Sequence, residues 1–117
     1  MALIIKTRYP HEFVNQIKRA IDEQEIETWR YDEDGDFTHT AQQWVNRAWF
    51  RAYPELDKVT FGIIGRKGVL LTREEYGLYH GRFTEMLMTH FAAEISEVVV
   101  QAPFVNEKDS HKVESQL

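Results

Sequence analysis

The chain has 117 residues, of which 43% are hydrophobic and 13% aromatic, and its formal net charge is -5. This much apolar surface can offset the entropy of ordering the chain, which excludes a disordered protein, and the length is that of one domain with one core. The absence of cysteine excludes a disulfide framework, a thiolate zinc site and a thiol nucleophile.

Charge and hydropathy narrow the class of partner. The balance of 14 Lys and Arg against 19 Asp and Glu weakens attraction to polyanions, which disfavours nucleic acid and favours a neutral or basic protein. Apolar runs are much shorter than the roughly 18 residues that span a bilayer, and residues 1–20 lack a signal-peptide core. We therefore expect a cytoplasmic protein without a membrane partner.

The first third of the chain predicts a helix and a hairpin. Residues 2–5 are apolar and form either an edge strand or a lead-in. Pro10 suits a first helical position, and a helix over 10–24 is predicted by apolar residues at helical spacing, namely Phe13, Ile17, Ala20 and Ile21. From Ile26 the period changes to two, which predicts strands at 29–31 and 37–39 around a turn in which Gly35 can take a positive φ.

The rest of the chain predicts further strands and a long helix. Thr40 can cap a short helical turn through Trp44, and strands follow at 47–53 and 58–64. Thr72 and Glu75 match the capping-box pattern, so a second helix should cover 73–93. The three valines within 96–102 are compatible with a last strand, and 106–117 is a polar tail.

This element order indicates an α+β fold. Residues 1–105 should form a single two-layer sandwich: a helix, an antiparallel meander of three to four strands, a long helix and a final strand, with both helices on one sheet face.

The acidic turn is a candidate cation site. Its carboxylates could bind calcium, which prefers several oxygen ligands: Asp32, Asp34 and Asp36. The spacing departs from that of an EF-hand, because the sixth and twelfth positions hold Phe37 and Gln43 instead of glycine and glutamate. The alternative is a solvated hairpin turn, which we favour.

Two features bear on nucleic-acid binding. Residues 65–68, GRKG, resemble over a few residues the GXXG loop of KH domains, although here a strand precedes the loop. The element order is also that of double-stranded RNA-binding domains, but Glu74 and Glu75 stand at the start of the last helix, where those domains place cations. A plain basic loop is the favoured interpretation.

Aromatic residues interleaved with arginine form a candidate binding surface on the strands. If adjacent strands pair as supposed, one face gathers Trp29, Tyr31, Trp49, Arg51 and Tyr53. Such a face is either core or a contact surface. If the helices cover the opposite face, which carries Phe50, Phe61 and Ile63, the Trp and Tyr side needs other cover, which is an argument for a dimer.

The second helix carries the remaining candidates. His80, with Tyr76 one turn earlier and Arg82 nearby, is the place to look for acid-base chemistry or a ligand, against the alternative of a histidine packed in the core. Gly77 and Gly81 are unexpected inside a helix, since each costs about 1 kcal/mol relative to alanine. Close approach of another backbone, from the first helix or from a second subunit, would compensate.

Two segments resemble small bacterial proteins of similar length to which no activity is assigned. The segments are WRYDEDGDFTH at 29–39 and YHGRFTEML at 79–87. The resemblance extends over most of the chain. It implies a bacterial origin and implies that the acidic turn and the patch at 79–83 belong together, and it brings no catalytic residue.

The sequence favours a non-catalytic protein-interaction module, such as an adaptor, a chaperone-like protein or a neutralising partner, that self-associates as a homodimer. No cofactor is indicated. The alternative is a small-ligand-binding protein or small enzyme, whose pocket would be lined by Tyr76, His80, Arg82, Trp29 and Trp49.

Overall fold

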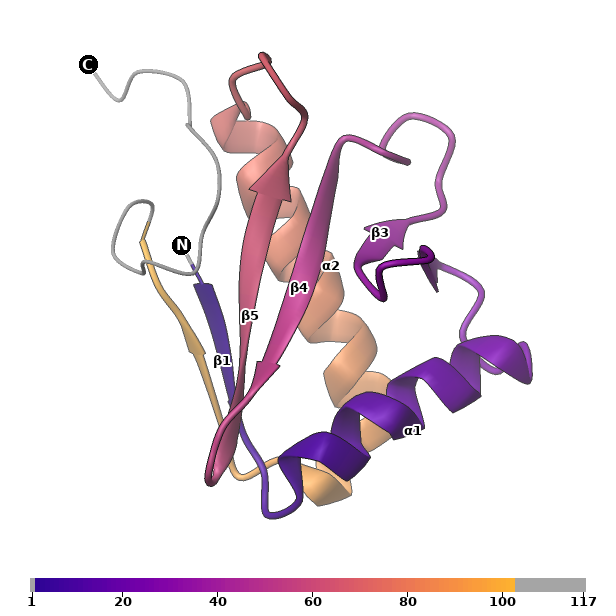
Figure 1. Cartoon of the computed structure of the whole chain (residues 1–117), viewed down its shortest axis with the longest axis vertical. Helices are drawn as coiled ribbons and strands as arrows, with labels where there is room; N and C mark the ends of the chain where they lie inside the picture. Colours follow the sequence, from indigo (N-terminus) through magenta and orange to yellow (C-terminus); the bar gives the residue numbers. More distant parts are fainter. Residues whose placement is uncertain (1, 103–117) are drawn as a thin grey trace.

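The computed structural model describes residues 2–102, in which two helices pack against a six-stranded antiparallel sheet (Figure 1). The elements in chain order are β1 (Ala2–Lys6), α1 (Pro10–Asp22), β2 (Trp29–Tyr31), β3 (Phe37–His39), β4 (Ala48–Pro54), β5 (Lys58–Gly65), α2 (Arg73–Phe91), the 3-10 helix η1 (Ala92–Glu94) and β6 (Glu97–Val100). This order confirms the predicted α+β fold. The predicted tail at 106–117 lies outside the described residues.

The sheet order is β2-β3-β4-β5-β1-β6. The meander from β2 to β5 is as predicted, but β1 is neither an edge strand nor a lead-in. It pairs with β5 on one side and β6 on the other, and Leu3 and Ile5 are fully buried. Its partners are far away in the sequence, so the local pattern of residues 2–5 carried no information about this internal position, next to the edge strand β6.

Helix α1 begins at Pro10 and buries one apolar side, which consists of Phe13, Val14, Ile17 and Ala20. It ends at Asp22, two residues before the predicted boundary, because Gln24 adopts a left-handed φ of 62° that stops the helix.

Helix α2 begins with the predicted capping box. The Thr72 hydroxyl accepts a hydrogen bond from the Glu75 N–H at 2.9 Å, and the Glu75 carboxylate accepts one from the Thr72 N–H at 2.9 Å. These two bonds satisfy backbone donors that a helix start leaves free. The α-helix ends at Phe91 and continues as η1, which accounts for the predicted end at 93.

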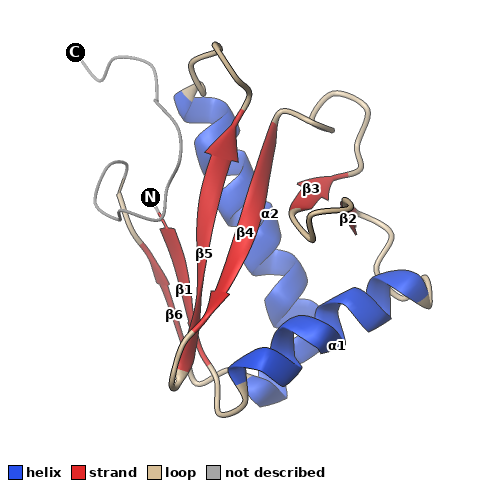
Figure 2. Cartoon of the chain, in the orientation of Figure 1, coloured by secondary structure: helices blue, strands red, loops and turns tan. Residues whose placement is uncertain are grey.

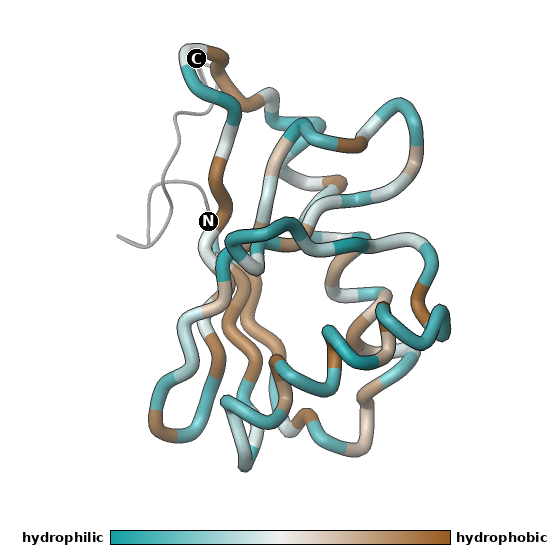
Figure 3. The backbone as a smooth tube through the Cα atoms, turned by 45° about the vertical axis from the view of Figure 1, so that its right-hand side comes forward, coloured by the Kyte–Doolittle hydropathy of each residue, from teal (hydrophilic) through white to brown (hydrophobic). Residues whose placement is uncertain are grey.

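Phe83 lies at the centre of an aromatic core between α2 and the sheet. Its ring centroid is 4.7 Å from that of Trp29, 4.8 Å from that of Phe50 and 5.0 Å from that of Phe61. Helix α1 joins the same buried cluster (Phe13 to Phe91, 5.6 Å), so both helices cover one face of the sheet (Figure 2). Figure 3 shows the hydrophobic strand segments running side by side through the middle of the fold.

Two smaller expectations need correction. The predicted helical turn is present as a single turn, in which the Val45 N–H donates to the Ala41 carbonyl at 2.8 Å, but Thr40 does not cap it, because its hydroxyl donates to the carbonyl of Glu27. The strand predicted at 47–53 is β4, and it includes Pro54 as its last residue instead of ending before this proline. No helix in the described part of the chain is long and apolar enough to cross a membrane.

Candidate functional site

The face of the sheet opposite the helices carries a group of apolar and aromatic side chains, which we call the open face. Alternation along β4 points Phe50 into the core, so Trp49, Arg51 and Tyr53 point to the other side. Pairing continues this face across the sheet, because Tyr53 lies opposite Thr60, Thr60 opposite Ile4, and Ile4 opposite Val99. Ile64, opposite Trp49, completes it.

No described helix or loop forms a layer on the open face, yet its side chains are mostly apolar. Trp49, Tyr53, Ile64 and Ile4 are half-buried, and Val99 is 37% exposed. In an antiparallel sheet with one solvated face, that face is normally polar. Within the row, Thr60 is 2% exposed and its hydroxyl donates to the carboxylate of Glu55, whereas Val99 is the most accessible apolar side chain. A partly accessible aromatic and aliphatic strip is typical of a contact surface.

Arg51 gives the open face a fixed cation. Its guanidinium donates two hydrogen bonds to Asp36, at 2.9 Å from Nε and 2.7 Å from Nη2. These hydrogen bonds, together with the charge of Asp36, raise the pKa of Arg51, which is therefore charged at every physiological pH. The bidentate geometry restricts the side chain, so Arg51 presents its charge in a set position.

The predicted surface combined residues of two opposite faces. Trp29 is 1% exposed and its ring packs edge-on against Phe83, so it belongs to the core. Tyr31 is on the same side as Trp29, with its ring centroid 6.2 Å from that of Phe37. The sheet register, Phe37 opposite Phe50, puts both on the helix side, while Trp49 and Tyr53 lie on the other.

The acidic turn is an ordered hairpin connection in which the carboxylates of Asp32 and Asp36 already have partners. Carboxylate oxygens of Asp32, Asp34 and Asp36 lie within 4.8 Å of one another. Asp32 accepts the backbone N–H groups of Asp34 (3.0 Å) and Asp36 (2.9 Å), and both oxygens of Asp36 bind Arg51. This arrangement is that of a turn closed by its own side chain.

His80 and Tyr76 lie in the core. Their exposed fractions are 2% and 1%, and their rings stack with centroids 4.6 Å apart. His80 Nδ1 lies 2.7 Å from the carbonyl oxygen of Tyr76, so this nitrogen carries a proton and donates it. Arg82 is exposed on another side of α2. The structure therefore keeps Tyr76 and His80 together but does not bring Arg82, Trp29 and Trp49 to them.

His39 is a second buried histidine, which the sequence analysis passed over. Its Nδ1 accepts the N–H of Ala41 at 3.0 Å, and its ring lies edge-on to Trp29 with centroids 5.1 Å apart. Burial, followed by the charge of Arg82, lowers the pKa of His39, which keeps the ring neutral at neutral pH. Its position at the end of β3 is that of a packing residue.

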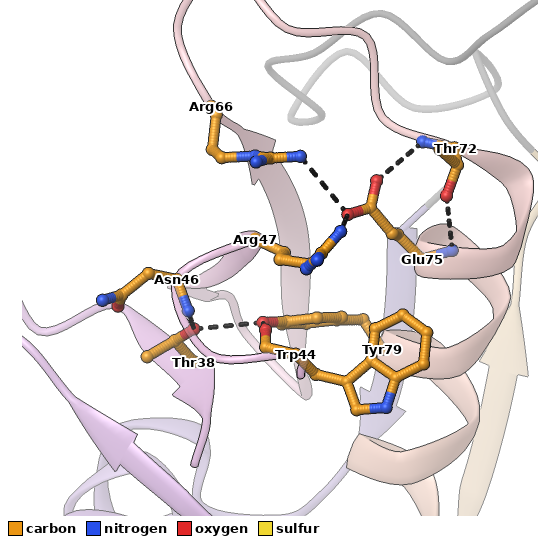
Figure 4. A network of polar contacts seen from close by, with 8 residues as sticks. All are labelled: Thr38, Trp44, Asn46, Arg47, Arg66, Thr72, Glu75 and Tyr79. Atoms are coloured by element: carbon orange, nitrogen blue, oxygen red, sulfur yellow. Dashed lines mark hydrogen bonds and ion pairs between the residues drawn. The ribbon is translucent and has the colours of Figure 1, made fainter. Parts of the chain in front are cut away.

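A polar network around Glu75 joins the loop after β5, the loop before β4 and α2 (Figure 4). Glu75 is 2% exposed and accepts hydrogen bonds from Arg47 at 3.1 Å and from Arg66 at 3.4 Å. Burial by itself would raise the pKa of Glu75, but the bonds from Thr72 and Arg47 outweigh it and the pKa is lowered. The capping box was visible in the sequence, whereas the two arginines reach Glu75 only through the fold.

Arg66 belongs to the GRKG segment. Its contact with Glu75 gives it a role in holding the start of α2, and the segment connects a strand to a helix instead of two helices. This connection differs from that of the KH loop.

Tyr79 anchors α2 to β3. Its hydroxyl donates to the carbonyl oxygen of Trp44 and lies 3.2 Å from the hydroxyl of Thr38 (Figure 4). Residues 29–39 and 79–87 meet here, since the hydroxyls of Thr38 and Tyr79 lie 3.2 Å apart and the rings of Phe37 and Phe83 have centroids 5.7 Å apart.

Gly77 and Gly81 lie on the exposed side of α2. A Cβ atom added at either position would meet no described atom within 4 Å. Close approach of α1, one of the two predicted explanations, therefore does not occur in the described part of the chain. Contact with a second subunit stays a prediction.

A hollow of about 640 Å³ opens where the start of α1 meets η1. Residues from separate segments line it, among them Arg8, Tyr9, Glu12, Phe13, Asp57 and Glu94. None of the residues predicted to bind a ligand lines it. Its rim mixes cations with carboxylates, so it favours no one sign of charge.

No family model, curated protein or solved structure matches the chain. Its function is therefore inferred from its own residues, among which the open face is the feature that the fold itself leaves unexplained.

Proposed function

We propose that the chain is a non-catalytic protein-interaction module that self-associates and that binds a protein partner through the open face. The observation that carries this proposal is the apolar strip of Trp49, Ile64, Ile4 and Val99 on a sheet whose other face already holds the core. Tryptophan and tyrosine at the centre of such a strip are the residue types that contribute most to protein binding.

The geometry of the open face suits a flat partner. Its side chains project from paired strands, so their positions are set by the sheet and little conformational entropy is lost on binding. Arg51, held by Asp36, adds a charge at a fixed position. Because the chain as a whole is acidic, a neutral or basic protein surface with an apolar centre is the partner of best fit.

The buried polar groups support a structural role over a catalytic one. Glu75 is bonded to two arginines and to the helix start, Asp36 is bonded to Arg51, and His80 donates to a backbone carbonyl. An active site would need such groups to face a cavity beside a substrate. Here their hydrogen bonds are directed to other parts of the fold.

Substitution of Trp49 tests the proposal. Tagged Trp49→Lys should recover less partner protein than wild type from the cells that encode the chain, and its affinity for the purified partner should fall by about tenfold or more, equivalent to ~1.4 kcal/mol. Leu56→Lys is the matched control, because Leu56 is 95% exposed at the β4–β5 turn.

Both variants should keep the unfolding temperature of the wild type within a few degrees. Equal recovery and equal affinity for the two variants would show that partners bind elsewhere.

Small-ligand binding is a second candidate, favoured by the hollow beside α1 and not by His80. Metabolite screening by thermal shift, compared between wild type and Arg8→Ala, distinguishes it. A ligand that stabilises the wild type and not the variant would support this candidate.

A further inference from the structure

The two edges of the sheet differ in how they are protected against strand pairing. An unprotected edge strand is a template for another strand, and proteins usually shield edges with short strands or charges. Edge strand β2 has three residues, exposes Arg30 and is tied by a 2.6 Å hydrogen bond from Tyr31 to Asp22. Strand β2 is therefore a poor template.

Edge strand β6, with four residues, is nearly as short, but among the described residues no side-chain hydrogen bond ties its outer side to another element. Its sequence is EVVV, with Val99 37% and Val100 50% exposed. Its one charged residue, Glu97, forms an ion pair at 3.3 Å with Lys6 of the neighbouring strand. The charge is thus directed back along the sheet, and the outer side of β6 is apolar.

The hydrogen bonds to β1 determine which backbone groups of β6 point outward. Gln101 donates its N–H to the carbonyl of Ala2 at 2.9 Å, and Ile4 lies opposite Val99. Because backbone groups in an antiparallel pair alternate in direction, Val99 also bonds to β1, whereas the N–H and C=O groups of Val98 and Val100 face away from the sheet.

We propose that two copies of the chain pair through β6, antiparallel about a two-fold axis at Val99. In this register Val98 of each copy exchanges backbone hydrogen bonds with Val100 of the other, so every outward group of both strands is satisfied. Val99 faces Val99 of the second copy on the open face. A two-fold contact of this kind is closed, which limits assembly to a dimer.

Charge and packing agree with this register. Glu97 lies opposite Gln101 of the second copy, so no two like charges are opposed, and the remaining cross-strand pairs are valines. Registers centred on Val98 or Val100 would instead pair Val100 with Ser96 or Val98 with Ala102, residues outside β6.

The β6 pairing rests on the proposed function, because it names the surface through which the proposed self-association occurs. It would also enlarge the proposed contact surface, because the row formed by Tyr53, Thr60, Ile4 and Val99 would continue into the same row of the second copy.

The test compares Val100→Pro with Val100→Thr by sedimentation equilibrium. Proline removes the outward N–H at position 100, while threonine keeps it together with the β-branched shape. We expect wild type and Val100→Thr to form dimers and Val100→Pro to raise the dimer dissociation constant by about tenfold or more. If Val100→Pro fails to fold, as judged by circular dichroism, Val100→Lys replaces it.

The outcomes separate this inference from the proposed function. A wild type that is monomeric at every concentration, or a folded proline or lysine variant that stays dimeric, overturns β6 pairing. A dimer that Trp49→Lys dissociates and the position 100 variants do not would overturn the pairing yet support the open face. Loss of partner recovery in Trp49→Lys with the dimer intact, together with dissociation of the Val100→Pro dimer, supports both.

Discussion

Glu75 illustrates how one side chain can serve two purposes in this fold. It caps α2 through Thr72 and holds Arg47 and Arg66, which belong to the loops on either side of the β4–β5 hairpin. Glu75→Ala removes the reciprocal cap and leaves the arginines without this partner, so we expect a loss of ~2 kcal/mol in the free energy of unfolding. Urea denaturation measures it. A loss no larger than that of an exposed substitution would contradict the role.

The pH dependence of stability follows from the same residue. The folded-state pKa of Glu75 lies below its ordinary value of 4.5. The unfolded chain therefore binds more protons than the folded chain as the pH falls below that value, and the stabilisation present above it is lost as the pH falls through the folded pKa. The stability difference between wild type and Glu75→Gln should shrink as the pH falls below 4.5 and through the lower folded-state pKa. A constant difference would contradict the shift.

Two glycines should respond in opposite directions to alanine. Gly77 is in the second turn of α2 with open space around it, so Gly77→Ala should raise the free energy of unfolding by ~1 kcal/mol. Gly35 has a φ of +83°, and a Cβ there would lie 2.9 Å from Nζ of Lys18, so Gly35→Ala should lower it by ~1 kcal/mol or more. Destabilisation by Gly77→Ala would indicate that something packs against this side of α2.

At the scale of elements, local sequence patterns predicted the helix starts and the turn, which depend on residues adjacent in the chain. Pro10 and the Thr72 capping box gave the starts of both helices, and Gly35 gave the hairpin turn. The position of β1 was missed because its partners, β5 and β6, are distant in sequence.

Which face of the sheet a residue occupies also depends on partners that are distant in the sequence. Alternation fixes which residues of one strand share a side, and this correctly separated Trp49 from Phe50. It does not fix how β2 and β3 align with β4, and the register of Phe37 opposite Phe50 moved Trp29 into the core. The pocket expected around His80 required Arg82 and the two tryptophans to converge, which depends on that register.

The β2–β3 hairpin should be the first part of the sheet to open. Strand β3 is paired with β4 at one position, Phe37 with Phe50, whereas β4 is paired with β5 along its whole length. Amide hydrogens in β2 and β3 should therefore exchange faster than those in β4 and β5, in a native-state exchange experiment. Equal protection of both hairpins would mean that the aromatic contacts of Trp29 compensate for the missing backbone bonds.

At the scale of the whole molecule, the fold is asymmetric. One face of the sheet holds the aromatic core beneath α1 and α2, and the other carries an apolar strip that no described layer covers. From the sequence, an uncovered aromatic face could be predicted only on the condition that the helices lie on the opposite face. The sequence does not show which face the helices occupy. With that established, a protein partner is the simplest reason for Trp49 and Ile64 to be where they are.

Site-specific photo-crosslinking in cells measures directly whether a protein partner contacts the open face. A photoreactive phenylalanine analogue placed at position 49 should yield a discrete crosslinked protein, whereas the same analogue at position 56, which is 95% exposed in the native chain, should not. The same product from both positions, or none from position 49 while the protein is folded, would contradict a contact surface on the open face.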